Sequence, residues 1–301
     1  MHPNPLLEKL GFSNTDRLAI IHCDDLGMCQ ASLTAFADLW DFGLISSGAT
    51  MVPCAWFPAL AAYCRSHPGV DMGVHITLTS EWDTYRWAPL STHDSASGLI
   101  DEEGYFYRSE VTAQQRGDPS AAQVEMQAQL ARALAAGIDV THIDTHMGTV
   151  AHPKFIPAYT QLGIENRLPA MILRLDEAGY LAMDMDAETA AFAAQAVFQL
   201  EEMGVPLLDN LFSMPLDQPE NQLEFAKKGF ADLPIGITHF ILHPSTDTPE
   251  LRAVAPDWPS RVANYHTFLS EELRQFIKNI GVHVIGYRAL CNVMRAARLR
   301  L

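Results

Sequence analysis

Short apolar runs alternate with segments of helical periodicity along most of the chain. Residues 70–78 and 237–242, for example, are apolar on both faces, which is typical of parallel strands that helices cover on each side. The helical pattern over 30–40 stops at Gly43, as helices often stop at a glycine. The alternation predicts strands at 18–22, 45–51, 70–78, 140–144, 170–175, 205–208, 237–242 and 282–285, and helices at 30–40, 58–65, 121–136, 155–162, 188–202, 222–229 and 261–280, with a closing helix after residue 285.

Seven or eight strand–helix units without a break in composition predict an α/β fold. We expect a single domain over residues 1–301, folded as a distorted (β/α) barrel. A doubly wound open sheet is the alternative, because a single sequence does not determine the number of strands.

Residues 80–118 do not follow this alternation. They carry tryptophan, tyrosine and phenylalanine among glycine, serine, aspartate and proline, without a helical period. A loop of this length predicts a substrate lid, in which exposed aromatic side chains would suit the apolar faces of sugar rings. A small hairpin packed on the barrel is the alternative.

Composition and charge exclude some classes of partner. The 36 acidic residues outnumber the 20 basic ones, giving a formal net charge of -16, and no dense Lys/Arg cluster occurs. We therefore expect no nucleic-acid or anionic-membrane partner. The five cysteines are scattered and form no C-x-x-C pair, which fits a reducing compartment. Neither a signal peptide nor a long apolar stretch is recognisable, so the expected location is the cytoplasm.

Two adjacent carboxylates, Asp24 and Asp25, follow the first apolar run. Like charges side by side in a cleft repel each other unless a cation neutralises them. In an extended segment the two side chains point to opposite sides, so one could hold a metal while the other acts as a base. The alternative is a turn in which one of them caps the following helix and Gly27 provides the bend.

Histidines at two later strand ends favour the metal. His75 lies in an apolar strand, where by itself it could be an ordinary core residue. If the strand at 140–144 stays extended through its end, His142, Asp144 and His146 share one face. Strand ends that supply one aspartate and two histidines are typical of a catalytic metal site with open positions for water.

Two further strand-end residues are candidates for catalysis. His243 could protonate a leaving amine or stabilise an oxyanion, or it could be a histidine hydrogen-bonded in a loop. Arg174 could neutralise a substrate, hold an oxyanion or orient Asp24, or it could form a surface ion pair. We expect His22 and His152 to be supporting or structural.

Several ordered motifs resemble those of the YdjC/ChbG-like carbohydrate deacetylases over most of the chain. The residues that carry the resemblance are Asp24-Asp25-Leu26-Gly27, 43–51, 73–79, Trp87-Ala88-Pro89-Leu90, Gly104-Tyr105-Phe106, His142-Ile143-Asp144-Thr145-His146 and Tyr287-Arg288-Ala289-Leu290.

The resemblance implies a distorted barrel that removes an N-acetyl group from a small amino sugar or oligosaccharide. Carried over by position, Asp25, His75 and His146 would bind one divalent metal ion, Zn²⁺ or Mg²⁺, and Asp24 would be the general base. The resemblance also suggests a homodimer. Other metal-dependent barrel enzymes stay open as alternatives, namely a nonsugar amidase, an isomerase or a phosphoesterase. A non-catalytic sugar-binding protein with a structural ion is a further one.

Overall fold

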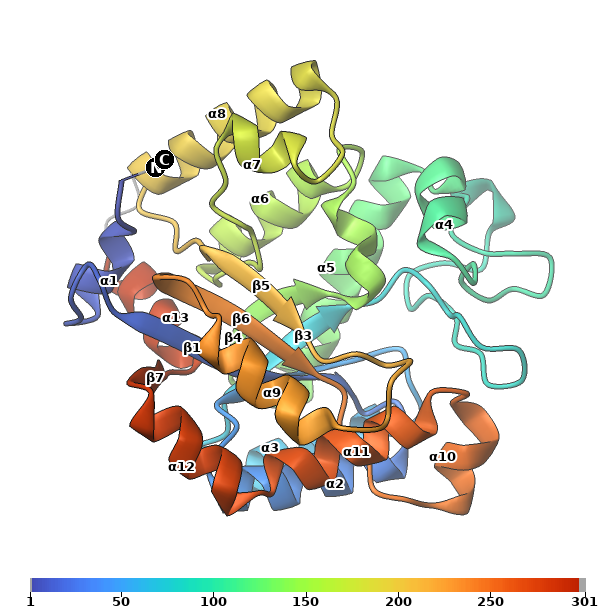
Figure 1. The fold of residues 1–301 in the computed structure, drawn as a ribbon. Coiled ribbons are helices and arrows are strands. Elements are labelled where there is room, and N and C mark those ends of the chain that lie inside the picture. The colour runs from blue at the N-terminus through green and yellow to red at the C-terminus, as the bar shows by residue number, and fades with distance from the viewer. Residues whose placement is uncertain (1, 298–301) are drawn as a thin grey trace.

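Seven parallel strands form the central sheet of the computed structural model, which describes residues 2–297 (Figure 1). Six follow the spatial order β4-β3-β2-β1-β6-β5, and β7 pairs with the first residues of β1. The strands are β1 (Arg17–Leu26), β2 (Ser47–Thr50), β3 (Met72–Ile76), β4 (Val140–Thr145), β5 (Asn210–Ser213), β6 (Gly236–Leu242) and β7 (Val282–Val284).

Irregular backbone closes the sheet between β4 and β5. Ala170 bridges to Ile143 of β4, and Leu173 bridges to Leu208, just before β5. The predicted strand at 170–175 is therefore reduced to isolated bridges, and the strand expected at 205–208 begins instead at Asn210. The prediction of an α/β fold with a distorted, barrel-like sheet is confirmed.

Helices cover the sheet on both sides, with α2, α3, α11 and α12 below it and α5, α6 and α8 above it in Figure 1. The helices are α1 (Pro5–Lys9), α2 (Gln30–Phe42), α3 (Phe57–Ser66), α4 (Glu110–Arg116), α5 (Pro119–Ala135), α6 (Ile156–Asn166), α7 (Glu177–Leu181), α8 (Ala187–Glu202), α9 (Gln222–Ala231), α10 (Pro249–Val254), α11 (Trp258–Phe268), α12 (Glu271–Asn279) and α13 (Tyr287–Ala296), with 3-10 turns η1 (Ser95–Ser97) and η2 (His146–Ala151).

The helix expected at 261–280 is two helices. Helix α11 ends at Phe268, and the side chain of Ser270 accepts a hydrogen bond from the backbone N–H of Leu273 at the start of α12. Serine is a strong N-cap because it satisfies a backbone donor that the first turn leaves free. This cap starts a new helix where the hydrophobic period alone predicts one continuous helix.

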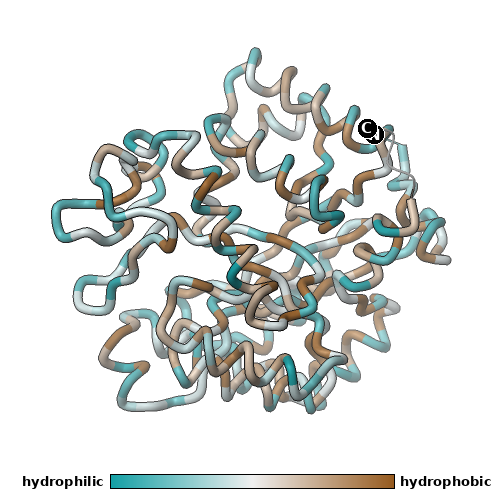
Figure 2. Tube along the Cα trace, turned by 180° about the vertical axis from the view of Figure 1, so that it is seen from behind, coloured by the Kyte–Doolittle hydropathy of each residue, from teal (hydrophilic) through white to brown (hydrophobic). Residues whose placement is uncertain are grey.

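The core lies between the sheet and the apolar faces of the helices. In α12, Leu273 and Ile277 are buried four residues apart, so one face packs inward while the charged face meets solvent. Hydrophobic residues recur along the central strands in Figure 2, whereas the loops projecting at the left are mostly hydrophilic. Within residues 2–297, no helix is both long and apolar enough to cross a membrane.

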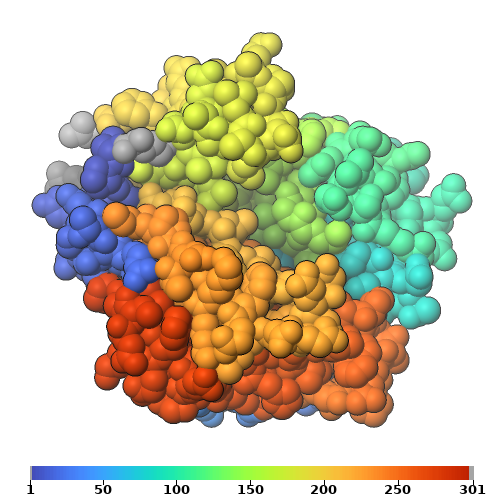
Figure 3. Space-filling view, viewed as in Figure 1, coloured from blue at the N-terminus to red at the C-terminus, as the bar shows by residue number. Residues whose placement is uncertain are grey.

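The 80–118 segment packs much of its aromatic content into the core. Trp82, Trp87 and Phe106 are buried, whereas Tyr105 is exposed. An antiparallel bridge joins Ile100 to Phe106, and the segment then continues into α4. In Figure 3 part of it projects at the right of the molecule. The expectation that its large rings are displayed to solvent is therefore wrong for these three, whereas the role of the segment as a substrate lid stays a prediction.

Candidate active site

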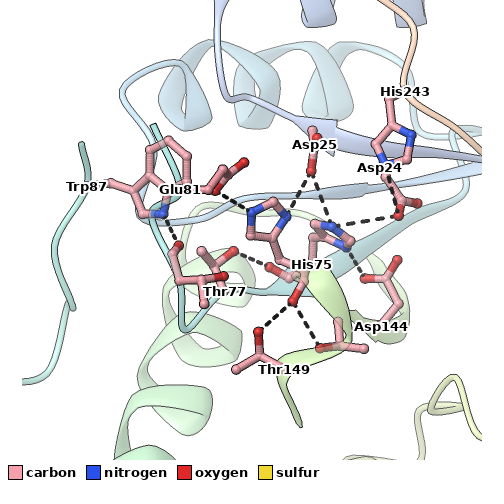
Figure 4. Close-up of polar contacts among 12 residues, drawn as sticks. Asp24, Asp25, His75, Thr77, Glu81, Trp87, Asp144, Thr149 and His243 are labelled. Carbon is pink, nitrogen blue, oxygen red and sulfur yellow. Dashed lines mark hydrogen bonds and ion pairs between the residues drawn. The ribbon is translucent and has the colours of Figure 1, made fainter. Parts of the chain in front are cut away.

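Side chains from four parallel strands meet beyond the carboxyl end of the sheet (Figure 4). Asp24 and Asp25 lie near the end of β1, His75 lies in β3, His146 directly follows β4, and His243 directly follows β6. Because the strands are parallel, their carboxyl ends share one edge, and residues far apart in sequence become neighbours there. We call these five residues the Asp–His cluster.

The two aspartates lie in a β-bulge. The pairing of β1 with β2 shifts between Cys23 and Leu26, and Asp25 has a φ of 58°. Such a bulge inserts an extra residue and re-aims side chains. Asp24 and Asp25 therefore do not point to opposite sides, as an extended strand would require. Their carboxylates lie 3.8 and 3.4 Å from the same atom, Nε2 of His75.

Three atoms of the cluster converge as metal ligands would. Oδ1 of Asp25 lies 3.4 Å from Nε2 of His75 and 3.1 Å from Nδ1 of His146. This oxygen is buried and accepts no hydrogen bond. Around a tetrahedral ion bound at about 2.0–2.2 Å, neighbouring ligand atoms lie about 3.3–3.6 Å apart. The residues present therefore fit one divalent ion.

Carboxylates hold the far nitrogens of both imidazoles. Nδ1 of His75 lies 2.9 Å from Oδ1 of Asp144, and Nε2 of His146 lies 2.9 Å from Oε2 of Glu81 (Figure 4). Histidines that bind metals are usually oriented in this way through their second nitrogen. Burial would lower the pKa of His146, but Glu81 and Asp25 raise it to about 9, so the centre of the cluster favours positive charge.

Arg261 holds the second oxygen of Asp25. Its Nη1 donates to Oδ2 of Asp25 at 2.7 Å, and its Nε donates to Oδ1 of Asp257 at 2.8 Å. Burial alone would raise the pKa of Asp25, but Arg261 and His146 outweigh it and hold that pKa well below its ordinary value. Asp25 is therefore an ionised carboxylate with one oxygen engaged and the other directed at the two imidazoles.

Asp24 lies next to His75, and His243 lies next to Asp24. Oδ2 of Asp24 lies 3.8 Å from Nε2 of His243, and Oδ1 lies 2.7 Å from Nδ1 of His22. Burial would raise the pKa of Asp24, but His75 and His22 outweigh it and hold that pKa well below its ordinary value. Nδ1 of His243 is buried without a hydrogen-bond partner. A carboxylate and an imidazole thus lie side by side.

A family model described as YdjC-like protein matches residues 18–279. The chain belongs to this family.

Named relatives agree with this membership, and a solved structure shares the fold. The chain is 31% identical to a carbohydrate deacetylase of Thermus thermophilus, over 95% of this chain and 97% of that protein. It is 28% identical to a chitooligosaccharide deacetylase of Serratia marcescens over 60% of this chain and 69% of that protein. A crystal structure from Enterococcus faecalis, described as a candidate cellobiose-phosphate cleavage protein, has the same fold, with a TM-score of 0.75 at 18% identity over 91% of this chain and 99% of that one.

Arg174 does not reach the cluster of this YdjC-like chain. Its Nε donates to Glu201 at 2.6 Å, and its Nη1 lies 3.5 Å from Asp209. Asp209 in turn accepts from the backbone N–H of Ile237, at the start of β6, whereas His243 follows the end of that strand. Arg174 is therefore a buried ion-pair residue at the opposite end of the barrel, and the catalytic role predicted for it is not supported by its position.

Sequence reasoning missed Glu81 and Arg261. Glu81 lies in the irregular segment after β3, where no periodicity indicates the direction of a side chain. Arg261 stands four residues after Asp257 on α11, a spacing that usually indicates an exposed helix ion pair. Its partner in the cluster, Asp25, is 236 residues away in sequence, so only the folded chain shows the contact.

Replacing Arg261 by methionine should destabilise the protein strongly. The change leaves Oδ2 of Asp25 buried without its partner, and breaking a buried pair in this way costs about 3–5 kcal/mol. Chemical unfolding should show the loss. The matched control is Arg252→Met, which removes an exposed pair with Asp247 and should cost less than about 1 kcal/mol. Equal effects of the two variants would contradict the role of Arg261.

Glu81→Gln should weaken metal binding about 10–100-fold, because His146 loses the carboxylate that orients its ring. Titration of the metal-free protein with Zn²⁺ measures this. Glu103→Gln is the control, since Glu103 is an exposed residue of the same loop and does not touch His146. Unchanged affinity in the Glu81 variant would show that this carboxylate does not support the ligand.

Proposed function

We propose that this protein removes the N-acetyl group from a small amino sugar or oligosaccharide with the help of one divalent ion held by Asp25, His75 and His146. The observation that carries the proposal is the pair Asp24 and His243, which lies beside three convergent ligand atoms. Relatives named carbohydrate and chitooligosaccharide deacetylases support it. Two imidazoles and a carboxylate favour Zn²⁺ over Mg²⁺ as the ion.

Asp24 is the general base of the proposed reaction. A divalent ion at this position would supply Lewis-acid polarisation of a carbonyl oxygen and would acidify water. Oδ2 of Asp24 faces His75 and His243, whereas Oδ1 is engaged by His22. Oδ2 therefore takes the proton of the water molecule whose oxygen bonds to the acetyl carbon.

His243 is the general acid. The proton that Asp24 takes from the water passes to Nε2 of His243 and makes this side chain an imidazolium. As the carbon–nitrogen bond breaks, its electron pair stays on the sugar nitrogen, which takes the proton from the His243 imidazolium and leaves as an amine. The other product is acetate. The separation of 3.8 Å between Asp24 Oδ2 and His243 Nε2 lets the proton collected by the base return to the acid through a small movement. Arg174 has no part in this scheme.

The surroundings of the cluster favour a neutral substrate over a phosphorylated one. Among residues 2–297, Arg261 is the one Lys or Arg side chain that forms an ion pair with the cluster, and Asp25 and Asp257 already occupy it. A phosphoesterase or sugar-phosphate isomerase needs groups that bind an anion. Three protein ligands also leave positions open for water, whereas a purely structural ion would have a closed set.

Acetate release tests the proposal directly. We expect release from N-acetylglucosamine or its short β-linked oligomers, loss of the activity with a chelator, and recovery on adding Zn²⁺ or Mg²⁺. N-acetylated peptides form the comparison series. Release from peptides but not from any sugar would replace the proposal by a nonsugar amidase, and activity that survives complete metal removal would contradict the metal-dependent mechanism.

The roles within the cluster are separable by mutation. His75→Ala should abolish both metal binding and activity, because it removes one of three ligands. Asp24→Asn should keep the ion and lower kcat by about 10²–10⁴-fold, since only the base is lost. Metal content and kcat measured on the same preparations distinguish the two. A His75→Ala protein with full metal content would contradict the ligand assignment.

A further inference from the structure

A layer of three histidines lies beneath the Asp–His cluster inside the barrel. His22 of β1, His142 of β4 and His239 of β6 are completely buried, and their rings lie close together. Neutral aliphatic side chains usually fill such a position in a barrel. The proposed reaction as described so far gives His142 and His239 no role.

Two of these histidines form a continuous hydrogen-bonded chain that ends on Asp24. Oδ1 of Asp24 lies 2.7 Å from Nδ1 of His22, and Nε2 of His22 lies 2.8 Å from Nε2 of His142. Nδ1 of His142 lies 3.0 Å from the hydroxyl of Thr141, which also contacts the carboxylate of Asp71. This series of contacts thus runs from Asp71 through Thr141, His142 and His22 to Asp24.

The chemistry of these atoms assigns their hydrogens. An ionised Asp24 only accepts, so Nδ1 of His22 carries a hydrogen. The hydroxyl of Thr141 donates its one hydrogen to Oδ1 of Asp71, so it accepts from Nδ1 of His142. The hydrogen on Nδ1 of His22 follows from the ionised Asp24 alone.

Two neighbouring residues hold the ring of His142 in its place. The phenol ring of Tyr287 stacks on the imidazole of His142, with ring centroids 3.8 Å apart and an angle of 12° between the planes. On another side, a Cβ atom at Gly73 would lie 2.4 Å from Nε2 of His142, so only glycine leaves room for the ring. The ring that contacts Nε2 of His22 is therefore itself fixed in place.

We propose that His22 is a positioning residue, which holds Oδ1 of Asp24 through its Nδ1 hydrogen and leaves Oδ2 free to take the proton of the attacking water, while His142 holds the opposite nitrogen of the His22 ring. The inference rests on the proposed function for its catalytic consequence. The orientation of Asp24 and the hydrogen on Nδ1 of His22 do not depend on which substrate the protein uses.

Two replacements of His22 separate this role from simple packing. His22→Leu removes the donor, so kcat should fall about 100-fold through misplacement of the base, with KM within about twofold and one ion per chain retained. His22→Asn keeps a donor, its Nδ2 amide, close to the former Nδ1, and should restore kcat to within about fivefold of the unchanged protein. His239→Gln is the matched control, because His239 lies in the same layer but its hydrogen bond goes to Tyr287. The kcat of His239→Gln should stay within about twofold of that of the unchanged protein.

Several outcomes would overturn the inference. These are an unchanged kcat in His22→Leu, the same loss in the Leu and Asn variants, or loss of a metal ion together with His22. The last result would make His22 a ligand. Nitrogen-15 NMR of the histidine side chains gives a readout without any substrate, and we expect His22 to carry hydrogen on Nδ1. A His22 without hydrogen on Nδ1 would refute the inference. Absence of acetate release by the unchanged protein would instead refute the proposed function, while the NMR result would still decide the role of His22.

Discussion

Three carboxylates, Asp24, Asp25 and Asp144, are buried at one end of the barrel, and the surrounding residues are arranged to balance their charge. An ionised carboxylate that loses its contact with water is stable inside a protein only when cations or hydrogen-bond donors compensate it. Arg261 supplies one permanent positive charge, and His22 and His75 supply donors. One buried guanidinium does not neutralise three carboxylates, so the site has a need for further positive charge that a divalent ion fits.

The three carboxylates share one pattern of contacts. Each has one oxygen held by a side chain, since Arg261 binds Asp25, His22 binds Asp24 and His75 binds Asp144. The second oxygens of Asp25 and Asp144 accept no hydrogen bond, and the second oxygen of Asp24 faces His243 at 3.8 Å. Holding one oxygen fixes the orientation of a carboxylate while the other oxygen stays available. This division lets adjacent aspartates have different roles, because different partners select which oxygen is free.

The sequence predicts the framework of this arrangement but not its details. Apolar runs locate most strands, and parallel strands bring Asp24, Asp25, His75 and His146 to one edge. The bulge at the aspartates is not predictable, because it depends on the pairing of β1 with β2. Arg261 and Arg174 illustrate the same limit, since the first was missed and the second was assigned to the wrong place. A helix arginine with an ordinary i,i+4 partner reaches the cluster, and an arginine at a predicted strand end lies at the far end of the barrel.

The strand order explains why the irregular part of the barrel does not disturb the site. Every member of the Asp–His cluster comes from β1, β3, β4 or β6, or directly follows one of them, and these strands lie on the continuous hydrogen-bonded path β4-β3-β2-β1-β6. Isolated bridges close the sheet on the other side, where Arg174 and the helices α7 and α8 are found. A constellation of ligands requires positions fixed to a fraction of an ångström, and regular paired strands provide this better than bridged loops. The sheet can therefore be distorted between β4 and β5 at little cost to the geometry on which the proposed chemistry depends.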